Sequence, residues 1–263
     1  MKAVLKYPGA KHRMAKWICS YMPKHNVYLE PFAGSLAVFF EKERSHIETV
    51  NDLDGEIVNF FRVIREFPEQ LEKKIALTPY SREEYENAFI PADDNVERAR
   101  RFCTRCWMGF GCSNLYKNGF KSGQQSKSPN PAAAWNFLPE TIKLAAVRLK
   151  SVQIEQMPAL ELLLRYDTED VFVYLDPPYL YDVRKKYLYK YEMSDEEHEK
   201  LISTVIGHKG KIMISGYDNE MYNSYLKGWN KVCKETIAES GAKRVEVLWM
   251  NYQAGQMCIN DFI

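Results

Sequence analysis

The chain carries the sequence VFVYLDPPY from Val171 to Tyr179, and this stretch decides the fold. Five consecutive apolar residues, Val171 to Leu175, are bounded by a proline pair. Such a run predicts a fully buried strand. The carboxylate of Asp176 follows at the carboxyl end of that strand, where open α/β sheets bind their ligands. The sequence therefore predicts an α/β fold with a binding site at this strand end.

The four residues that end this stretch, Asp176-Pro177-Pro178-Tyr179, suit the binding of a planar amino group. Neither proline has a backbone N–H and both fix φ, so the turn is stiff and its carbonyl groups are free to accept hydrogen bonds. We expect Asp176 and a proline carbonyl to accept the two hydrogens of the amino group, and Tyr179 to stack on its ring. The alternative is a strand that ends in a Pro-Pro turn, with Asp176 as a local cap.

Periodicity along the rest of the chain predicts a parallel sheet with crossover helices. We expect strands at 27–30, 47–52, 151–156, 171–175, 211–215 and 244–252, and helices at 10–21, 36–44, 57–67, 82–89, 96–107, 142–149 and 194–206. The last helix begins with a capping box, from Ser194 to Glu197. Residues 81–136 end in glycine-, asparagine- and proline-rich sequence typical of loops and hairpins. We therefore divide the chain into a main domain, residues 1–80 and 137–263, and an inserted subdomain, residues 81–136.

Length and composition fit one domain with a modest insertion: the chain has 263 residues, and 46% of them are hydrophobic. No apolar run approaches the about 18 residues of a membrane-spanning helix. The N-terminus lacks the apolar core of a signal peptide, so we expect a cytoplasmic protein. Cys103, Cys106 and Cys112 invite a zinc site, but a closed site needs four ligands and no His stands nearby. No metal is predicted.

Positive charge gathers in one part of the sequence. The net charge is +1, yet residues 98–130 contain seven basic residues and no Asp or Glu. A local basic field on a mildly acidic body is typical of a polyanion-binding site, although a solvated basic face gives the same pattern. The basic residues are Arg98, Arg100, Arg101, Arg105, Lys117, Lys121 and Lys127.

A second strand-end turn predicts a nucleoside site. Residues 30–35, Glu-Pro-Phe-Ala-Gly-Ser, follow the strand expected at 27–30, and Gly34 permits close approach of the backbone to a ligand. Asp52 stands at the end of the next strand, where an acid accepts both hydroxyls of a ribose. The alternative for residues 51–54 is a helix N-cap, a role that we expect of Asp54.

These segments together resemble the DNA adenine methylase (Dam) family of N6-adenine methyltransferases, above all its phage and prophage branch. In that family the Asp176 to Tyr179 motif is catalytic, and residues 30–35 form part of the S-adenosylmethionine site. The resemblance implies that Phe32 and Gly34 wrap the cofactor, that Asp52 holds its ribose, and that Glu30 and Asp176 border the same site. Residues 6–11 resemble the N-terminal motif of the family, which implies that Tyr7, Gly9 and Lys11 flank the methionine end of the cofactor.

The sequence departs from the family pattern at two positions. The usual glycine pair of the N-terminal motif is Gly9-Ala10 here. Pro158 stands near the position where members often carry an acid that contacts the cofactor adenine. Recognition of the adenine would then fall to the backbone or to a neighbouring residue.

The resemblance extends from Lys6 to about Tyr252 and implies a Rossmann-like S-adenosylmethionine-dependent methyltransferase sheet. The main domain would be catalytic, and residues 81–136 would be the target-recognition subdomain that binds double-stranded DNA. A tyrosine-rich, basic segment after Tyr179 would close over the DNA, although the same tyrosines suit a packed ribbon. Major-groove reading uses Arg, Lys, Asn and Gln side chains. The candidates for DNA contacts in the two segments are Arg105, Asn114, Lys117, Asn118, Lys121, Arg184, Lys185 and Tyr191.

The implied reaction is methyl transfer from S-adenosylmethionine to the adenine N6 atom at a short DNA sequence. Positioning and electrostatics suffice for this chemistry, and the target base has to leave the stack. Two other functions stay open: an RNA or protein methyltransferase with the same pocket, and a catalytically idle DNA-binding regulator. We expect a monomer, and a restriction endonuclease from the same system is a candidate partner.

Overall fold

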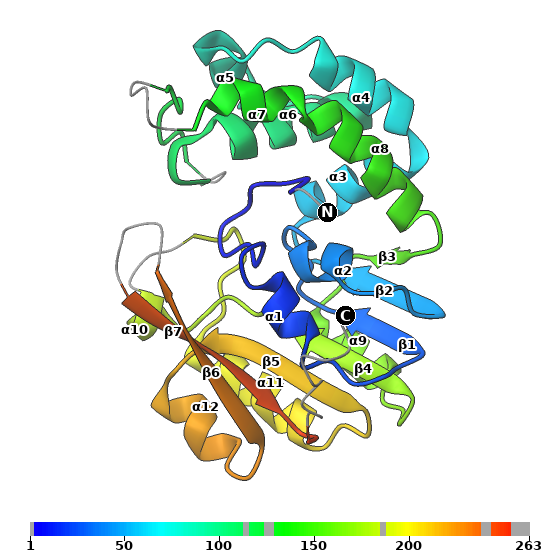
Figure 1. Ribbon diagram of the computed structural model, residues 1–263, viewed down its shortest axis with the longest axis vertical. Coiled ribbons are helices and arrows are strands. Elements are labelled where there is room, and N and C mark those ends of the chain that lie inside the picture. The colour runs from blue at the N-terminus through cyan, green and yellow to red at the C-terminus, as the bar shows by residue number, and fades with distance from the viewer. Residues whose placement is uncertain (1–2, 113–115, 124–128, 185–187, 238–242, 254–263) are drawn as a thin grey trace, which may run out of the picture.

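The protein, described here by a computed structural model for residues 3–112, 116–123, 129–184, 188–237 and 243–253, is built on one seven-stranded sheet (Figure 1). The strand order is β3-β2-β1-β4-β5-β7-β6. The strands are β1 Val27–Glu30, β2 Ile47–Asn51, β3 Gln153–Glu155, β4 Val171–Leu175, β5 Lys211–Tyr217, β6 Asn230–Ile237 and β7 Lys243–Met250.

Neighbouring strands from β3 to β5 are parallel, whereas β7 runs antiparallel to both β5 and β6. The predicted parallel sheet is therefore confirmed for five strands. All five residues of β4 are buried, as the apolar run from Val171 to Leu175 predicted. The chain runs outward from β1 to β2 and β3 and then returns to β4 on the other side of β1. Such a reversal of strand order opens a crevice at the carboxyl ends of β1 and β4.

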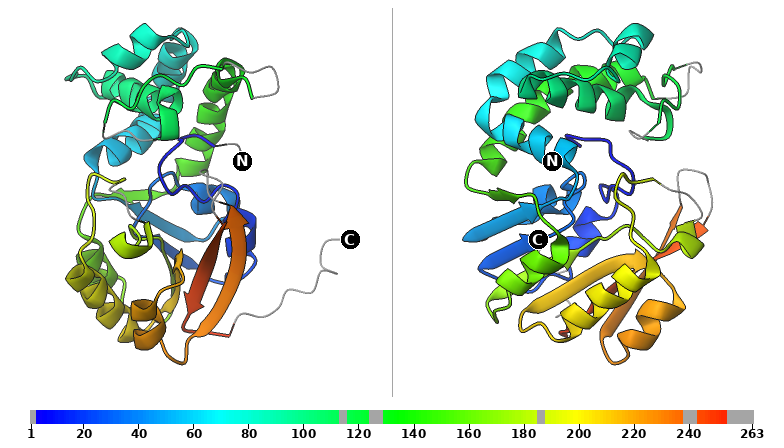
Figure 2. Two further views of the ribbon diagram at one scale, coloured as in Figure 1. Left: turned by 90° about the vertical axis from the view of Figure 1, so that its left-hand side faces the viewer. Right: turned by 180° about the vertical axis from the view of Figure 1, so that it is seen from behind.

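Side chains alternate between the two faces of the sheet, and each face has its own helices. Tyr28, Phe172 and Tyr174 join the core on the face of α1, Ala15–Cys19, and α2, Ala37–Glu41. Leu29 and Val173 join a second core with α9, Ala159–Arg165, α11, Asp195–Ile206, and α12, Glu220–Tyr225. Figure 2, seen from behind, shows α9 and α11 in front of the strands. None of the helices in the described ranges is long and apolar enough to cross a membrane.

Helices α3 to α8 form a lobe beyond the β3 edge of the sheet, at the top of Figure 1. It comprises α3 Gly55–Glu66, α4 Pro68–Ala76, α5 Arg82–Asn87, α6 Asn95–Met108, α7 Pro131–Asn136 and α8 Leu138–Leu149. The predicted insertion, residues 81–136, lies within this lobe, but α4 and α8 from the flanking sequence pack against one another there as well. The core of the lobe is continuous with the core on the α1 and α2 face of the sheet.

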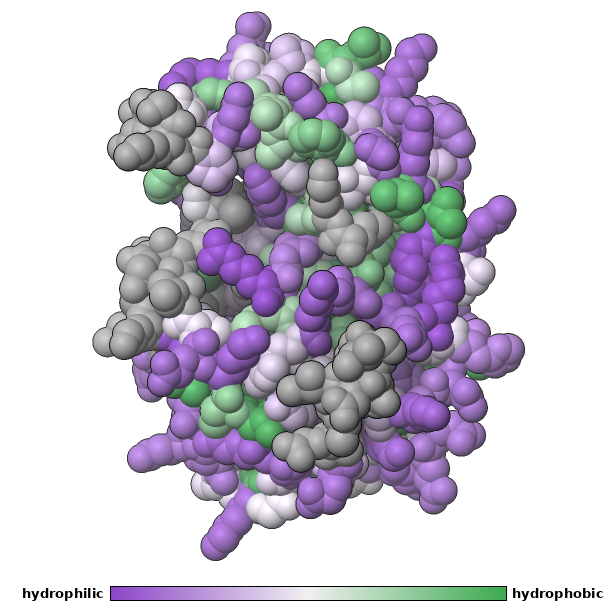
Figure 3. All heavy atoms as spheres, viewed as in Figure 1, coloured by the Kyte–Doolittle hydropathy of each residue, from purple (hydrophilic) through white to green (hydrophobic). Residues whose placement is uncertain are grey.

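Two predicted helices are shorter than periodicity suggested. The helix expected at 10–21 is α1, Ala15–Cys19, because residues before it form turns, with the Ala10 amide bonded to the Tyr7 carbonyl at 3.2 Å. The helix expected at 36–44 ends at Glu41. The capping box at Ser194 is confirmed: Ser194 and Glu197 each accept from the backbone N–H of the other. Figure 3 shows a largely hydrophilic surface with small hydrophobic groups between the charged side chains.

Candidate active site

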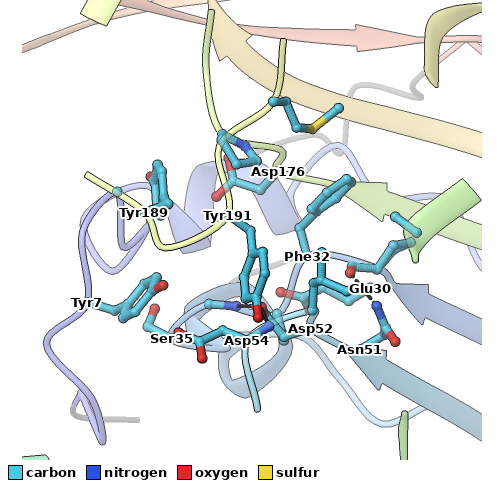
Figure 4. A pocket seen from close by; sticks show the side chains of 18 of the residues that line it. Tyr7, Glu30, Phe32, Ser35, Asn51, Asp52, Asp54, Asp176, Tyr189 and Tyr191 are labelled. Atoms are coloured by element: carbon cyan, nitrogen blue, oxygen red, sulfur yellow. Dashed lines mark hydrogen bonds between the residues drawn. The ribbon is translucent and has the colours of Figure 1, made fainter. Parts of the chain in front are cut away.

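A pocket with a volume of about 220 Å³ opens at the carboxyl ends of β1, β2 and β4 (Figure 4). Every residue predicted to contact a cofactor lines this pocket, although the fold brings them from four separate segments. They are Tyr7, Gly9, Lys11, Glu30, Phe32, Gly34, Asp52 and Asp176. Pro178 lines the same pocket, whereas Pro177 and Tyr179 border a small cavity beside it. The individual roles of these residues stay predictions.

Asp52 is held at the bottom of the pocket by backbone N–H groups. Its Oδ2 accepts from the Gly34 amide and its Oδ1 from the Asp54 amide, both at 2.9 Å. Gly34 has φ of 47°, a conformation that favours glycine. Burial raises the pKa of Asp52 to about 6, although these N–H groups oppose the shift. Asp54 accepts from the Glu56 amide and begins α3, so its predicted N-cap role is confirmed.

Glu30 is the second perturbed acid of the pocket. Its side chain is buried, and its Oε2 accepts from the Tyr28 hydroxyl at 2.6 Å. Burial raises the pKa of Glu30 to about 8, although the Tyr28 hydrogen bond works in the opposite direction. Burial therefore favours the protonated form of Glu30.

Asp176 lies at the edge of the pocket with one oxygen engaged. Its Oδ1 accepts from the Lys11 Nζ and from the Ser215 Oγ, each at 2.9 Å. None of the described residues donates to Oδ2. Burial disfavours the charge on Lys11, but Asp176 and then Glu246 outweigh it, so the pKa of Lys11 is raised. Lys11 therefore stays charged and holds the Asp176 carboxylate in place.

Tyr179 is held by two residues that sequence reasoning missed. Its hydroxyl donates to Glu246 Oε2 at 2.9 Å, and its ring meets the Tyr217 ring edge-on, with 4.7 Å between centroids. Burial, followed by Glu246 and Asp176, raises the pKa of Tyr179, so the phenol stays neutral. Glu246 and Tyr217 are paired neighbours on β7 and β5. No local signal connects them to Tyr179, because they approach it only through strand pairing.

Residues 188–193, which we name the strap, cross the mouth of the pocket. Tyr189, Tyr191, Glu192 and Met193 line the pocket, and Glu192 accepts from the amides of Leu188 and Tyr189. Lys190 lies 3.8 Å from Asp54. Tyr191, which we predicted to contact DNA, therefore lies in the wall of the predicted cofactor site (Figure 4).

Asn51 is a further residue that sequence reasoning missed. Its Nδ2 donates to the carbonyl oxygens of Pro31 and Met157, and its Oδ1 accepts from the Met157 amide. Asn51 thereby joins the turns after β1 and β3. Met157 and Pro158 lie in the pocket wall with Phe32 and Leu160. This wall is apolar, as a surface for a flat ring requires.

The four arginines among the seven basic residues of the basic segment form ion pairs with carboxylates from outside it, so less positive charge is left for a polyanion than the sequence suggested. Polyanion binding by this segment stays a prediction. Arg98 and Arg105 bind Glu56, and Arg105 also donates to the Ala88 carbonyl. Arg100 and Arg101 bind Glu97, one residue before the segment starts. Charge counted along the sequence misses Glu56 because it belongs to α3, which packs against α6.

The other predicted DNA contacts have varied environments. Lys117 and Asn118 are exposed, and Lys117 lies 3.9 Å from Glu86. Lys121 is half-buried, and its backbone carbonyl accepts from Tyr80. Arg184 ends α10, Tyr181–Arg184, and its side chain is outside what the structure describes. Asn114 and Lys185 lie outside the described residues. The described part of the chain contains no group of three or more His, Cys, Asp or Glu side chains that could hold a metal ion.

Comparison with known proteins decides between the families that use such a pocket. Residues 7–245 match the model of the D12 class N6 adenine-specific DNA methyltransferases. The chain belongs to this family. The predicted resemblance to adenine methylases is thereby confirmed, as are the Rossmann-like methyltransferase fold and S-adenosylmethionine as the methyl donor. The phage and prophage branch stays a prediction.

Three relatives of this D12 family member show how far the similarity extends. The Type II methyltransferase M1.LlaDCHI of Lactococcus lactis subsp. cremoris is 28% identical, over 68% of this chain and 66% of that protein. The Type II methyltransferase M.MjaIII of Methanocaldococcus jannaschii is 25% identical, over 96% of this chain and 99% of that protein. The DNA adenine methylase of Vibrio cholerae is 25% identical, over 68% of this chain and 65% of that protein. The chain thus aligns with about two thirds of the first and third relatives and with nearly all of the second.

Proposed function

We propose that the chain transfers a methyl group from S-adenosylmethionine to the N6 amino group of adenine, at a specific short sequence in double-stranded DNA. One observation carries the proposal: Asp176 lies at the edge of the pocket with Oδ1 held by Lys11 and Ser215, while no described residue donates to Oδ2. An acceptor oriented in this way suits an N–H group of an incoming amine.

The adenine amino nitrogen is a poor nucleophile, because its lone pair is delocalised into the ring. Asp176 Oδ2 and the Pro177 carbonyl would accept its two hydrogens, draw it toward tetrahedral geometry and free the lone pair. When bound, S-adenosylmethionine supplies a methyl group on a positively charged sulfur. As the new N–C bond replaced the S–C bond of the donor, Asp176 would accept one of the two amino protons. Positioning and electrostatic stabilisation account for such a step without a strong base.

The target base has to leave the duplex, because its N6 atom is inaccessible in the stack. Tyr179 is the proposed stacking platform, since it directly follows the Asp176 turn and is partly exposed. The family and the relatives support methylation of DNA; base flipping and these residue roles are our proposals.

The helical lobe is the proposed target-recognition element, with residues 81–136 at its centre. Two of its segments, 108–110 and 119–121, pair antiparallel through the Gly109–Phe120 bridge. Residues 116–118, just before the second segment, are exposed. A paired protrusion with exposed Lys117 and Asn118 suits contact with phosphates or base edges. A monomer, a cytoplasmic location and a restriction endonuclease partner remain predictions, the last supported by the Type II names of two relatives.

Sequencing that detects modified bases tests the function directly. DNA from cells that express the protein should carry N6-methyladenine at one short sequence, and DNA from cells that express Asp176→Ala should not. Labelled methyl groups found in RNA or protein instead would favour the first alternative. An unmodified genome, together with DNA binding in vitro, would favour a catalytically idle regulator.

A further inference from the structure

Glu246 meets the catalytic motif from the antiparallel part of the sheet. It accepts the Tyr179 hydroxyl at 2.9 Å. Its side chain is partly buried, and no ion pair within 4.0 Å joins it to a described residue. Burial raises the pKa of Glu246, while Lys11 opposes the shift at longer range. The desolvation of this carboxyl group is only partly offset, because Lys11 acts on it from beyond the distance of an ion pair.

Tyr179 is thus held at two points by neighbouring strands. Glu246 on β7 holds its hydroxyl, and Tyr217 on β5 meets its ring at an interplanar angle of 74°. Glu246 and Tyr217 are directly paired in the β5–β7 register, so their spacing is fixed by the sheet itself. Lys11 Nζ lies 4.7 Å from the centre of the same ring. The plane of Tyr179 is therefore set by three segments far apart in the sequence.

The packing around Tyr179 is not complete on every side. A small cavity of about 10 Å³ beside the motif is bordered by Tyr179, Leu180, Tyr217 and Tyr222. This space is about the size of one water molecule, so ring contacts are missing on this side of Tyr179. The hydroxyl contact with Glu246 therefore adds a restraint on the ring that packing on this side does not supply.

We propose that Glu246 is a positioning residue, which accepts the Tyr179 hydroxyl and so holds the ring in the plane where the flipped adenine stacks while its N6 atom meets Asp176. The inference rests on the proposed function. Glu246 touches neither the reacting nitrogen nor the methyl group, and it acts through Tyr179. Since misplacement by about 1 Å can slow an enzyme on the order of 100-fold, loss of this contact should lower kcat.

The test compares Glu246→Leu, Glu246→Gln, Tyr179→Phe and the double variant Tyr179→Phe/Glu246→Leu with the wild type. Each protein is assayed for kcat, for KM with target DNA and for cofactor affinity. The fluorescence of 2-aminopurine at the target position reports stacking of the flipped base. Glu235→Leu on the adjacent strand β6, where Glu235 is exposed, is the matched control.

We expect Glu246→Leu and Tyr179→Phe each to lower kcat about tenfold, because both remove the same hydrogen bond. The double variant should be no slower than either single variant, and 2-aminopurine should fluoresce more brightly in all three. Glu246→Gln keeps an acceptor and should stay within about threefold of wild type. Cofactor affinity should change less than about twofold throughout.

Three results would overturn the proposal. Wild-type kcat in Glu246→Leu would show that the contact is dispensable. Multiplied losses in the double variant would show that Glu246 acts by another route. Loss of cofactor affinity in parallel with kcat would show a purely structural role. Failure of the proposed function would appear in the wild-type protein itself, whereas failure of this inference appears only in the variants.

Discussion

Glu30 and Asp52 are acids whose pKa values are raised mainly by burial, to about 8 and about 6. S-adenosylmethionine carries a positive sulfur, and a nearby positive charge favours the ionised form of an acid. Binding should therefore release protons, and affinity should increase as the pH rises from about 6 to about 8, the range of these two values. Titration calorimetry in buffers of different ionisation enthalpy measures both effects.

S-adenosylhomocysteine is the control ligand for this prediction, because its sulfur is neutral. Its affinity should depend less on pH than that of S-adenosylmethionine. Equal pH dependence for the two ligands would contradict a role for the sulfur charge in the ionisation of Glu30 and Asp52.

The predicted contact between Asp52 and the cofactor ribose can be tested separately. If its carboxylate accepts the ribose hydroxyls, Asp52→Ala should weaken cofactor binding by about 1.5–3 kcal/mol, the value of hydrogen bonds to a charged group. DNA affinity should stay within about twofold of wild type. Asp170→Ala, at an exposed acid before the opposite end of β4, is the matched control. Unchanged cofactor affinity in Asp52→Ala, measured by calorimetry, would refute the ribose contact.

At the scale of elements, the strap and the N-terminal segment meet at Gly9. A Cβ atom there would lie 2.1 Å from the Tyr189 hydroxyl oxygen, and Gly9 has φ of +70°. Gly9→Ala should therefore displace the strap and raise the cofactor Kd about tenfold, or ~1.4 kcal/mol. Equilibrium binding of the cofactor measures the change.

Two variants separate the contact from backbone strain. Tyr189→Phe in the Gly9→Ala background removes the clashing oxygen and should restore part of the affinity. Gly228→Ala carries similar strain, with φ of +97°, but its added Cβ would meet nothing within 4 Å. It should lower stability and leave cofactor affinity unchanged. If Gly228→Ala weakened cofactor binding as much as Gly9→Ala, the contact with the strap would not be the cause of the lost affinity.

Elements with a local sequence signal were predictable. The apolar run of β4 and the capping box at Ser194 gave both position and type, because burial and capping depend on neighbouring residues. Of the two antiparallel strands β6 and β7, only β7 was predicted. Several residues of β6 are exposed at the edge of the sheet, so its sequence lacks the pattern of a buried strand. The Tyr179–Glu246 bond and the Arg105–Glu56 pair were not predictable, because packing between distant elements creates them.

At the scale of the whole molecule, the proposed DNA binding would depend on the positive charge that remains after internal ion pairing. Lys117→Ala/Lys121→Ala should lower the slope of log affinity against log salt by up to ~2, about 0.9 for each lost phosphate contact. The control is the double variant Lys143→Ala/Lys150→Ala, with Lys143 on α8 and Lys150 directly after it. In Figure 1, α8 lies on the other side of the lobe from α5, the helix whose Glu86 lies near Lys117. Titrations at several salt concentrations, on target and scrambled duplexes, measure the slope. A double variant that binds both duplexes like wild type at every salt concentration would remove these lysines from the interface.

The most direct test of the account combines methyl transfer and cofactor binding in purified protein. DNA is incubated with S-adenosylmethionine that carries a deuterated methyl group, and its nucleosides are analysed by mass spectrometry. We predict deuterated N6-methyladenine with wild type and none with Asp176→Ala, although that variant should bind cofactor within about tenfold, or ~1.4 kcal/mol. Label on cytosine alone, or wild-type turnover by Asp176→Ala, would contradict the assignment of Asp176 as the residue that activates the adenine amino group.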